Sequence, residues 1–590
     1  MLLAGKLHDP DNHPTASRLI AICESTDCMR LPDASSLQVS MRSNTTAKVL
    51  TEGSLTAEVV STILTSQCRW HEVLAAVATD LQSTGQRSHS VVQFGIGDCV
   101  PTSTFNEAEV GIRKFNAISL PNTSTPPTVD VGSGYLYPED AVAITSMACR
   151  TAGANTVEEF WELISSGRSM VQEVPRERIN IPGSFRTGQD KWAQRRKFYG
   201  NFVSDVDVFD NTFFHVNPRE AIAMDPQQRL LLETAYQAVE SSGYLATHRR
   251  DSGDRVGVFI GASYIDYIEH VAAYGPTAYT APGTIRAFLC GKISHYFGWL
   301  GPSEVFDTAC SASGVAITRA CRALQSGECS MALAGGVNLM STPTNFLDLG
   351  KAGFLSPSGQ CKPFESNADG YCRGEGVGLI MLKRLSQAQF DGDRILGVIP
   401  GTATNQGGLS SSITVPHHLS QIALFRDILR QANMSPEKVS YVEAHGPGTQ
   451  AGDPIEIASI RDVFGGSSRL DTVHIGSVKA NIGHCEPGAG ILGVIKALLM
   501  IEKGIIPPLA NFSTLNPKIP PLKPDKMQSL LEKSPGMRTS RQSASTAMEL
   551  QAATLLFLCV SHLRAESRVA RPAKILAFLL CSAHRPNKAY

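Results

Sequence analysis

Short apolar runs alternate with segments of helical apolar spacing between residues 141 and 501. The runs typical of buried strands are residues 141–144, 255–261, 331–337, 440–446 and 473–479. The segments with helical spacing are residues 156–165, 221–233, 315–324 and 491–501. In the first of these helices, Thr156 and Glu159 are spaced as a capping box. Strands that alternate with helices predict an α/β fold with a largely parallel sheet covered on both faces.

The first 120 residues also predict mixed α/β structure, with helices at 57–64 and 70–81 and a strand at 90–94. Residues 120–134 then consist mainly of proline and small polar residues, which bury little apolar surface and indicate a linker. We therefore expect a first domain at residues 1–120, a linker at 121–137, a main domain at 138–527 and a separate segment at 528–590.

Composition excludes several classes of protein. The 53 basic and 54 acidic residues give a net charge of −1, so we expect no nucleic-acid partner and no binding to an anionic membrane. No apolar run approaches the roughly 20 residues needed to span a bilayer, and the first residues lack the pattern of a signal peptide. The 14 cysteines contain no Cys-x-x-Cys pair, which argues against a disulfide framework and a zinc site and favours the reducing cytoplasm.

Three chemically reactive residues follow apolar strands. Cys310 lies between a short strand and a helix, where the helix N-terminus favours a thiolate, and His445 and His484 follow later strands. Because ligands bind at the carboxyl ends of parallel strands, we expect these side chains to converge, with Lys479 nearby. A nucleophile, two hydrogen-bond donors and a cation would then share one crevice. Taken singly, each side chain is equally compatible with a buried structural role.

The segments around these residues resemble the signatures of β-ketoacyl synthase domains, most closely those of fungal iterative non-reducing polyketide synthases. The three main signatures are residues 307–313, 443–454 and 479–484, and two further matches are residues 218–229 and 370–376. The resemblance covers about residues 138 to 525.

This resemblance implies a thiolase-type fold with two similar βαβ halves in a layered α/β/α/β/α arrangement. It also implies a decarboxylative Claisen condensation, in which Cys310 accepts the growing acyl chain as a thioester. His445 and His484 would promote loss of CO₂ from a malonyl thioester and stabilise the enolate, while Lys479 would support His484. The backbone N–H of Cys310 is the expected oxyanion donor, and Asp453 is expected to orient other groups rather than to react.

Residues 5–100 resemble the C-terminal part of the starter-unit acyltransferase domain that precedes such synthases. His8 corresponds in this resemblance to the general base of that domain, and a simple loop histidine is the alternative. The nucleophilic cysteine of the domain would precede Met1, so we expect no transacylase activity.

The end of the chain departs from the family pattern. The glycine-rich, phenylalanine-containing strand pair that closes the family's domain is not recognisable after residue 527. Residues 528–590 instead contain Ser, Arg and Ala with two apolar runs at 555–560 and 575–580. We expect a truncated or wrongly assembled product with an unrelated tail and a sheet that lacks its closing strands.

The sequence therefore predicts a ketosynthase that binds no cofactor or metal directly. The chain has no Gly-x-Ser-x-Gly acyltransferase motif and no carrier-protein serine motif. An acyl carrier protein with its phosphopantetheine arm and a malonyl-loading acyltransferase are expected in trans, and a homodimer is expected through the ketosynthase domain. The alternatives are an inactive or regulatory remnant, a thiolase-like enzyme acting on coenzyme A thioesters, and a dimeric scaffold. The starter unit, the chain length and the product stay open.

Overall fold

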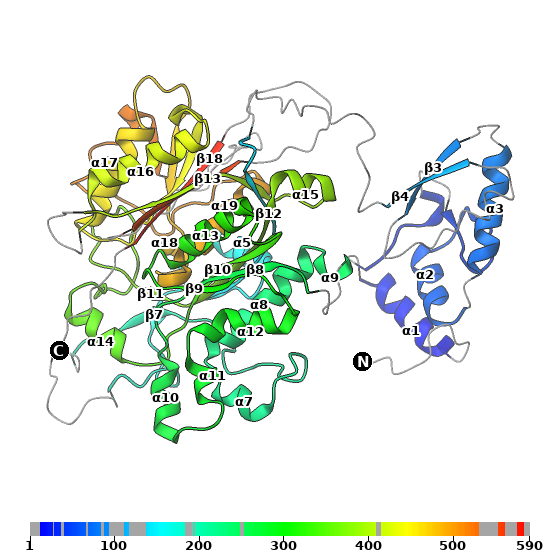
Figure 1. Ribbon diagram of the computed structural model, residues 1–590, viewed down its shortest axis with the longest axis horizontal. Helices are drawn as coiled ribbons and strands as arrows, with labels where there is room; N and C mark the ends of the chain where they lie inside the picture. Colours follow the sequence, from blue (N-terminus) through cyan, green and yellow to red (C-terminus); the bar gives the residue numbers. More distant parts are fainter. Residues whose placement is uncertain are drawn as a thin grey trace. The chain divides into compact units, whose positions relative to one another are not determined.

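The computed structural model describes most of the chain, in two compact units of residues 1–123 and 124–590 (Figure 1). The described residues are 12–26, 29–36, 41–66, 69–83, 88–93, 111–116, 137–182, 192, 195–247, 253–408, 415–529, 553–560 and 575–582. No helix in these ranges is both long and apolar enough to span a bilayer.

The described residues of the first unit form three α-helices and two pairs of strands. The helices are α1 (His13–Glu24), α2 (Leu55–Leu64) and α3 (Trp70–Ser83). The strands β1 (Met41–Arg42) and β2 (Val49–Leu50) pair antiparallel, and β3 (Ser88–Gln93) and β4 (Gly111–Asn116) pair parallel. The Ser54 side chain caps α2 by accepting a hydrogen bond from the Ala57 N–H (3.2 Å). His8 lies outside the described residues.

The second unit is built on an eleven-stranded sheet with the spatial order β16-β15-β14-β18-β17-β13-β5-β12-β10-β8-β9. Its strands are β5 (Val142–Thr151), β8 (Val256–Gly261), β9 (Ser303–Phe306), β10 (Met331–Asn338), β12 (Gly376–Arg384), β13 (Gly397–Asn405), β14 (Val439–Glu443), β15 (Val473–Gly476), β16 (Met527–Ser529), β17 (Ala553–Val560) and β18 (Ile575–Ser582). A small separate sheet contains β6 (Gln172–Glu173), β7 (Tyr199–Asn201) and β11 (Arg373–Gly374).

The large sheet consists of two similar halves. In the first half β8 is parallel to β9 and β10, and β12 is antiparallel to β10 and β5. In the second half β14 is parallel to β15 and β18, and β17 is antiparallel to β18 and β13. The equivalent strands β5 and β13 pair antiparallel and join the halves, which places an approximate two-fold axis between them. The expected duplication of two α/β halves is therefore present.

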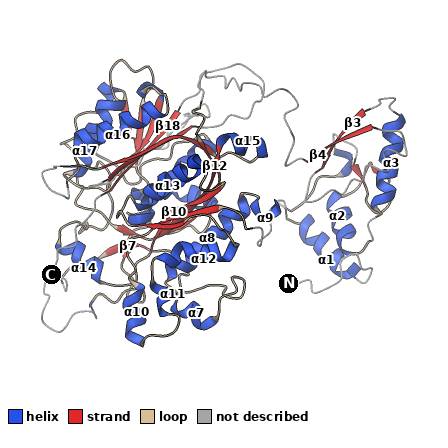
Figure 2. Cartoon of the chain, in the orientation of Figure 1, coloured by secondary structure: helices blue, strands red, loops and turns tan. Residues whose placement is uncertain are grey.

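Helices form three layers around the curled sheet (Figure 2). One outer layer contains α8 and α12, the central layer contains α13 and α19, and the other outer layer contains α16 and α17. The helices of this unit are α5 (Val157–Ser165), α7 (Pro218–Ala223), α8 (Pro226–Ser241), α9 (Tyr244–Thr247), α10 (Tyr267–Tyr274), α11 (Thr280–Thr284), α12 (Ala287–Phe297), α13 (Ala312–Ser326), α14 (Thr344–Lys351), α15 (Leu385–Asp391), α16 (His418–Gln431), α17 (Gly452–Phe464), α18 (Lys479–Ile482) and α19 (Ala489–Lys503).

The helix predicted at residues 221–233 is two helices, so that prediction was wrong in its extent. The chain breaks between α7 and α8 at Met224 and Asp225, where Met224 has an extended backbone. The buried Asp225 side chain accepts a hydrogen bond from the Gln227 N–H (2.8 Å) and caps α8, whose first residue is Pro226. A proline that follows a capping aspartate begins a helix and cannot continue one.

The expectation that the sheet lacks strands after residue 527 was also wrong. The two apolar runs beyond residue 527 form β17 and β18, which fill the space between β13 and β14. Paired strands there satisfy backbone N–H and C=O groups that would otherwise be exposed in the middle of the sheet. Their order differs from that of the first half, because the later strand β18 lies beside β14 whereas the earlier strand β10 lies beside β8.

We predict that Gly261→Ala destabilises the second unit by about 1–3 kcal/mol, the usual cost of overpacking. Gly261 ends β8, and a Cβ atom there would lie 2.3 Å from the backbone nitrogen of Ser313 in α13. The helix could relieve this overlap only by moving away from the sheet. Urea unfolding followed by circular dichroism measures the change.

The matched control is Gly291→Ala, inside α12. A Cβ atom at Gly291 has no heavy atom within 4 Å, so this change should stabilise the helix by about 0.5–1 kcal/mol. Equal effects of the two substitutions would contradict the close packing of α13 on β8.

Candidate active site

Cys310 is presented by a tight turn between β9 and α13. Ala309, immediately before it, has a positive φ of 53°, a conformation that is strained for a residue with a side chain. The buried Ser311 hydroxyl stabilises the turn by donating to the Thr308 carbonyl oxygen (3.1 Å). Cys310 is half-buried and lies two residues before the first residue of α13. The positive end of the α13 dipole therefore lies next to the cysteine turn.

The start of α13 is bonded to the segment that follows His484. The Ser313 hydroxyl, three residues after Cys310, accepts a hydrogen bond from the Ile491 N–H (3.2 Å) at the start of α19. Gly336, in β10, also lies against this turn, since a Cβ atom there would be 2.8 Å from the Ser313 Cβ and 2.7 Å from the Pro487 carbonyl oxygen. The fold thus brings the cysteine turn and the second histidine segment to the same region.

The two candidate histidines lie against each other. The imidazole centroids of His445 and His484 are 5.2 Å apart, with ring planes at 78°. His445 is 4% exposed and His484 is 2% exposed. His445 follows β14, whereas His484 follows the short helix α18, and the ring of Tyr371 lies 5.1 Å from His484. The sequence-based expectation placed both at strand ends, and the second is separated from its strand by this one-turn helix.

Both imidazoles are uncharged near neutral pH. Burial and the charge of Lys479 lower the pKa of His445 and His484 well below the ordinary value. The Glu486 N–H donates a hydrogen bond to Nδ1 of His484 (2.9 Å). A neutral imidazole that accepts at Nδ1 carries its proton on Nε2, so His484 can donate a hydrogen bond from Nε2 to a substrate oxygen.

Lys479 is a buried cation at the start of α18. Burial lowers its pKa, and the nearby carboxylates of Glu443 and Glu456 oppose that shift. Glu443 also anchors the preceding turn, because it accepts hydrogen bonds from the Val478 N–H (2.5 Å) and from Lys496 (2.7 Å). The position of Lys479 therefore depends on a buried network that extends to α19.

A second pair of buried carboxylates holds the loop that carries His445. Glu456 accepts hydrogen bonds from the N–H groups of His445 (2.6 Å) and Gly446 (2.9 Å). Asp453 accepts from the N–H groups of Phe364 (2.8 Å) and Thr449 (3.0 Å), so it contacts the loop and not an imidazole. Burial raises the pKa of Asp453 to about 6 and also raises that of Glu456.

Sequence reasoning did not single out Glu443 or Glu456. The available signal was a carboxylate among apolar neighbours. Glu443 ends a buried strand, and Glu456 lies beside Ile457 on the buried face of α17. Acidic residues are rarely buried without a partner, so such a position suggests a structural or functional hydrogen bond.

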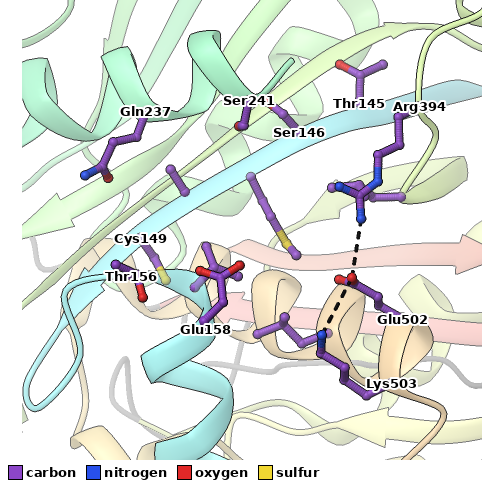
Figure 3. A pocket seen from close by; sticks show the side chains of 15 residues that line it. Thr145, Ser146, Cys149, Thr156, Glu158, Gln237, Ser241, Arg394, Glu502 and Lys503 are labelled. Atoms are coloured by element: carbon purple, nitrogen blue, oxygen red, sulfur yellow. Dashed lines mark hydrogen bonds and ion pairs between the residues drawn. The ribbon is translucent and has the colours of Figure 1, made fainter. Parts of the chain in front are cut away.

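A hollow of the second unit is separate from these residues (Figure 3). It is lined in part by Cys149, Glu158, Gln237 and Ser241, and at one end Glu502 pairs with Arg394 (3.3 Å) and with Lys503 (3.7 Å). Burial raises the pKa of the Cys149 thiol, so this cysteine is a poor nucleophile. Within the described ranges, no group of three or more His, Cys, Asp or Glu residues is arranged to hold a metal ion.

Comparison with protein families gives two adjacent matches. Residues 139–388 match the family described as beta-ketoacyl synthase, N-terminal domain, and residues 396–513 match beta-ketoacyl synthase, C-terminal domain. Among solved structures, the chain is similar to the ketosynthase from module 6 of the bacillaene synthase of Bacillus subtilis 168, with 32% identity and a TM-score of 0.64 over 72% of each chain. An oxazolomycin ketosynthase domain of Streptomyces albus JA3453 is 33% identical, with a TM-score of 0.65 over 73% of this chain and 76% of that domain.

Curated relatives include fungal synthases that are several times longer. The non-reducing polyketide synthase atr1 of Stereocaulon alpinum is 58% identical over 531 residues, which is 89% of this chain and 21% of that protein. Preu6 of Preussia isomera is 49% identical and pks12 of Talaromyces marneffei is 52% identical. The chain spans about a fifth to three tenths of the length of these relatives.

We predict that neither His445 nor His484 takes up a proton between about pH 8 and about pH 6, because the pKa of each lies well below the ordinary value of about 6.5. The unfolded chain does take up protons in this range, so both histidines make stability fall as pH decreases below about 6.5. Nuclear magnetic resonance of labelled histidines measures the titration.

Lys479→Met should raise the pKa of both imidazoles, since it removes a nearby positive charge. Lys503→Met, in the separate hollow, is the matched control and should leave both titrations unchanged. Titration of either wild-type imidazole near pH 6.5 would show that the pair is not held neutral by burial.

Proposed function

The chain belongs to the β-ketoacyl synthase family, and we propose that it joins a Cys310-bound acyl chain to a malonyl unit by decarboxylative Claisen condensation in polyketide biosynthesis. The observation that carries this proposal is the buried contact between two neutral imidazoles, His445 and His484. The hydrogen bond between Ser313 and Ile491 supports placing Cys310 beside them.

The first step is transfer of the acyl chain to the enzyme. The Cys310 thiolate attacks the thioester carbonyl of an acyl carrier protein and a new carbon–sulfur bond forms. The bond between that carbonyl and the carrier sulfur breaks, and the carrier leaves as a thiolate. The N–H groups at the start of α13 stabilise the oxyanion of this step.

The second step breaks the bond between the malonyl carboxylate and its α-carbon. CO₂ leaves, and the electron pair passes into the thioester carbonyl to give an enolate. The Nε2–H of His484 donates to the enolate oxygen, and His445 lies close enough to act on the same group. An apolar, buried setting also favours loss of the charged carboxylate as neutral CO₂.

The third step forms the new carbon–carbon bond. The enolate carbon attacks the Cys310 thioester, the tetrahedral intermediate collapses, and the Cys310 thiolate leaves. The product is a β-ketoacyl chain on the carrier. Lys479 does not react in this scheme. Its charge helps burial to keep both imidazoles neutral, so that each has one N–H to donate.

The proposed partners follow from this chemistry. The acyl and malonyl groups would be delivered on the phosphopantetheine arm of an acyl carrier protein, and a malonyl-loading acyltransferase would charge that carrier in trans. We also propose that residues 1–120 are part of a starter-unit acyltransferase domain. The match to atr1 over 531 residues supports similarity beyond the two ketosynthase models.

A homodimer through the second unit is part of the proposal. Strand β9 is at the end of the large sheet, so one of its edges is left for pairing with a second copy. Ile285 is 50% exposed and Phe288 is 37% exposed, and both flank Arg286, which pairs with Asp307 (2.9 Å) just after β9. These two apolar side chains would be covered at the same interface.

We predict that incubation with an acyl carrier protein bearing a short acyl chain adds that acyl group to Cys310, as measured by peptide mass spectrometry. Cys310→Ala should abolish this adduct, while Cys321→Ala should retain it. Cys321 lies in α13, the helix that follows Cys310, but burial raises its pKa and leaves it unreactive. Absence of both the adduct and CO₂ release from malonyl carrier protein would favour an inactive remnant.

We predict that Ile285→Asp combined with Phe288→Asp converts a dimer to a monomer, because it places two charges in the proposed interface. Sedimentation velocity measures the change. Phe390→Asp replaces an apolar side chain that is 85% exposed on α15 and should leave the size unchanged. A wild-type monomer at micromolar concentration would contradict the proposed interface.

A further inference from the structure

Arg373 is a fully buried cation close to the candidate site. Its guanidinium makes two parallel hydrogen bonds to the Glu486 carboxylate, from Nε to Oε1 (2.9 Å) and from Nη2 to Oε2 (3.0 Å). The ring of Phe346 lies 4.9 Å from the guanidinium carbon. Arg373 is 0% exposed, and Glu486 is also buried. A buried ion pair of this kind is costly to break, because the remaining partner would be an uncompensated charge.

Glu486 has an unusual backbone conformation. Its φ is +46°, in the left-handed region that residues with a Cβ atom rarely adopt. In this conformation its N–H points to Nδ1 of His484 (2.9 Å). The carboxylate that Arg373 binds and the N–H that His484 accepts therefore belong to the same strained residue.

The backbone around Arg373 holds His484 as well. The His484 N–H donates to the Cys372 carbonyl oxygen (2.8 Å), and the Gly374 N–H donates to the His484 carbonyl oxygen (2.8 Å). These two bonds form a parallel bridge between Arg373 and His484. Arg373 thus contacts the histidine segment from both sides, through its neighbours' backbone and through the Glu486 carboxylate.

We propose that Arg373 and Glu486 are positioning residues that fix the tautomer of His484. The ion pair keeps Glu486 in its left-handed conformation, the Glu486 N–H occupies Nδ1, and the proton of His484 is thereby confined to Nε2. The catalytic part of this inference rests on the proposed condensation, in which that Nε2–H stabilises the enolate. The tautomer follows from the hydrogen bond between the Glu486 N–H and Nδ1 of His484 and does not rest on the proposed condensation.

Two double variants separate the backbone conformation from the buried charges. Both replace Arg373 by Met, so neither leaves an unpaired guanidinium. Arg373→Met with Glu486→Gly retains a residue that adopts positive φ freely, whereas Arg373→Met with Glu486→Ala does not. The two proteins differ only by the Cβ atom at residue 486.

Labelled-histidine nuclear magnetic resonance reports the tautomer, with the His484 signals assigned by their loss in His484→Asn. We expect the Nε2–H form of His484 in the wild type and in the glycine variant, and a mixture of both tautomers in the alanine variant. For CO₂ release from malonyl carrier protein, we expect kcat of the alanine variant to fall at least tenfold below that of the glycine variant. The KM values should agree within about twofold, since an interaction confined to the transition state lowers kcat alone.

The control for general loss of structure is Arg150→Lys. Arg150 pairs with Glu233 (2.8 Å) between β5 and α8, an ion pair that includes neither Arg373 nor Glu486, so this variant should keep the wild-type His484 tautomer. If the double variants do not fold, Glu486→Gln is measured in their place. It keeps the size of the side chain and weakens the pair with Arg373, and it should give the tautomer mixture. An unchanged tautomer in every folded variant would overturn the proposal.

The two proposals fail in different ways. If the wild-type protein releases no CO₂ but the glycine and alanine variants differ in the His484 tautomer, the proposed condensation is contradicted and the positioning role is supported. A wild-type protein that releases CO₂, with equal tautomers and equal kcat in the glycine and alanine variants, would contradict the positioning role alone.

Discussion

The exclusion of water from His445 and His484 is the constraint on which the candidate site depends. Two imidazoles whose centroids are 5.2 Å apart would repel each other if both were protonated, and burial lowers the pKa of each well below its ordinary value. The charge of the buried Lys479 also lowers the pKa of both imidazoles. The nearby carboxylates of Glu443 and Glu456 in turn favour the charged form of Lys479. The buried network of Glu443, Lys479 and Lys496 is therefore as necessary to the pair as the histidines themselves.

The curled sheet makes this burial possible. Its two halves meet at β5 and β13, and the central helices α13 and α19 lie between the halves (Figure 1). Cys310 precedes α13 and His484 precedes α19, so the same layer of helices positions both segments of the candidate site. The hydrogen bond from Ile491 to Ser313 connects the two helices directly, and small residues permit their close approach.

The sequence predicted the parts of the structure that local patterns determine. Strands and helices from residue 141 to 501 appear close to their expected positions, because apolar periodicity reports which face is buried. Motif spacing also selected Cys310, His445, His484 and Lys479 as candidates, and the structure brings the two imidazoles together. The carboxylates of Glu443 and Glu456 were not identified as structural groups, since each accepts from a backbone N–H that only the folded loop presents. Glu486 was not identified either, because its partner Arg373 is distant in sequence. The strands β17 and β18 were missed because the strands they pair with are distant in sequence and their own sequence departs from the family pattern.

The order of strands has a consequence for how the second unit folds. In each half the later strands, β10 and β12 in the first and β17 and β18 in the second, fill the space between two earlier strands of the same half. In the second half, β17 and β18 fill the gap between β13 and β14 and follow both of these strands in the chain. Until they emerge from the ribosome, the facing edges of β13 and β14 have unsatisfied backbone groups. Such edges are prone to pair with other chains, so the yield of native protein in cells should depend on how quickly translation supplies these two strands.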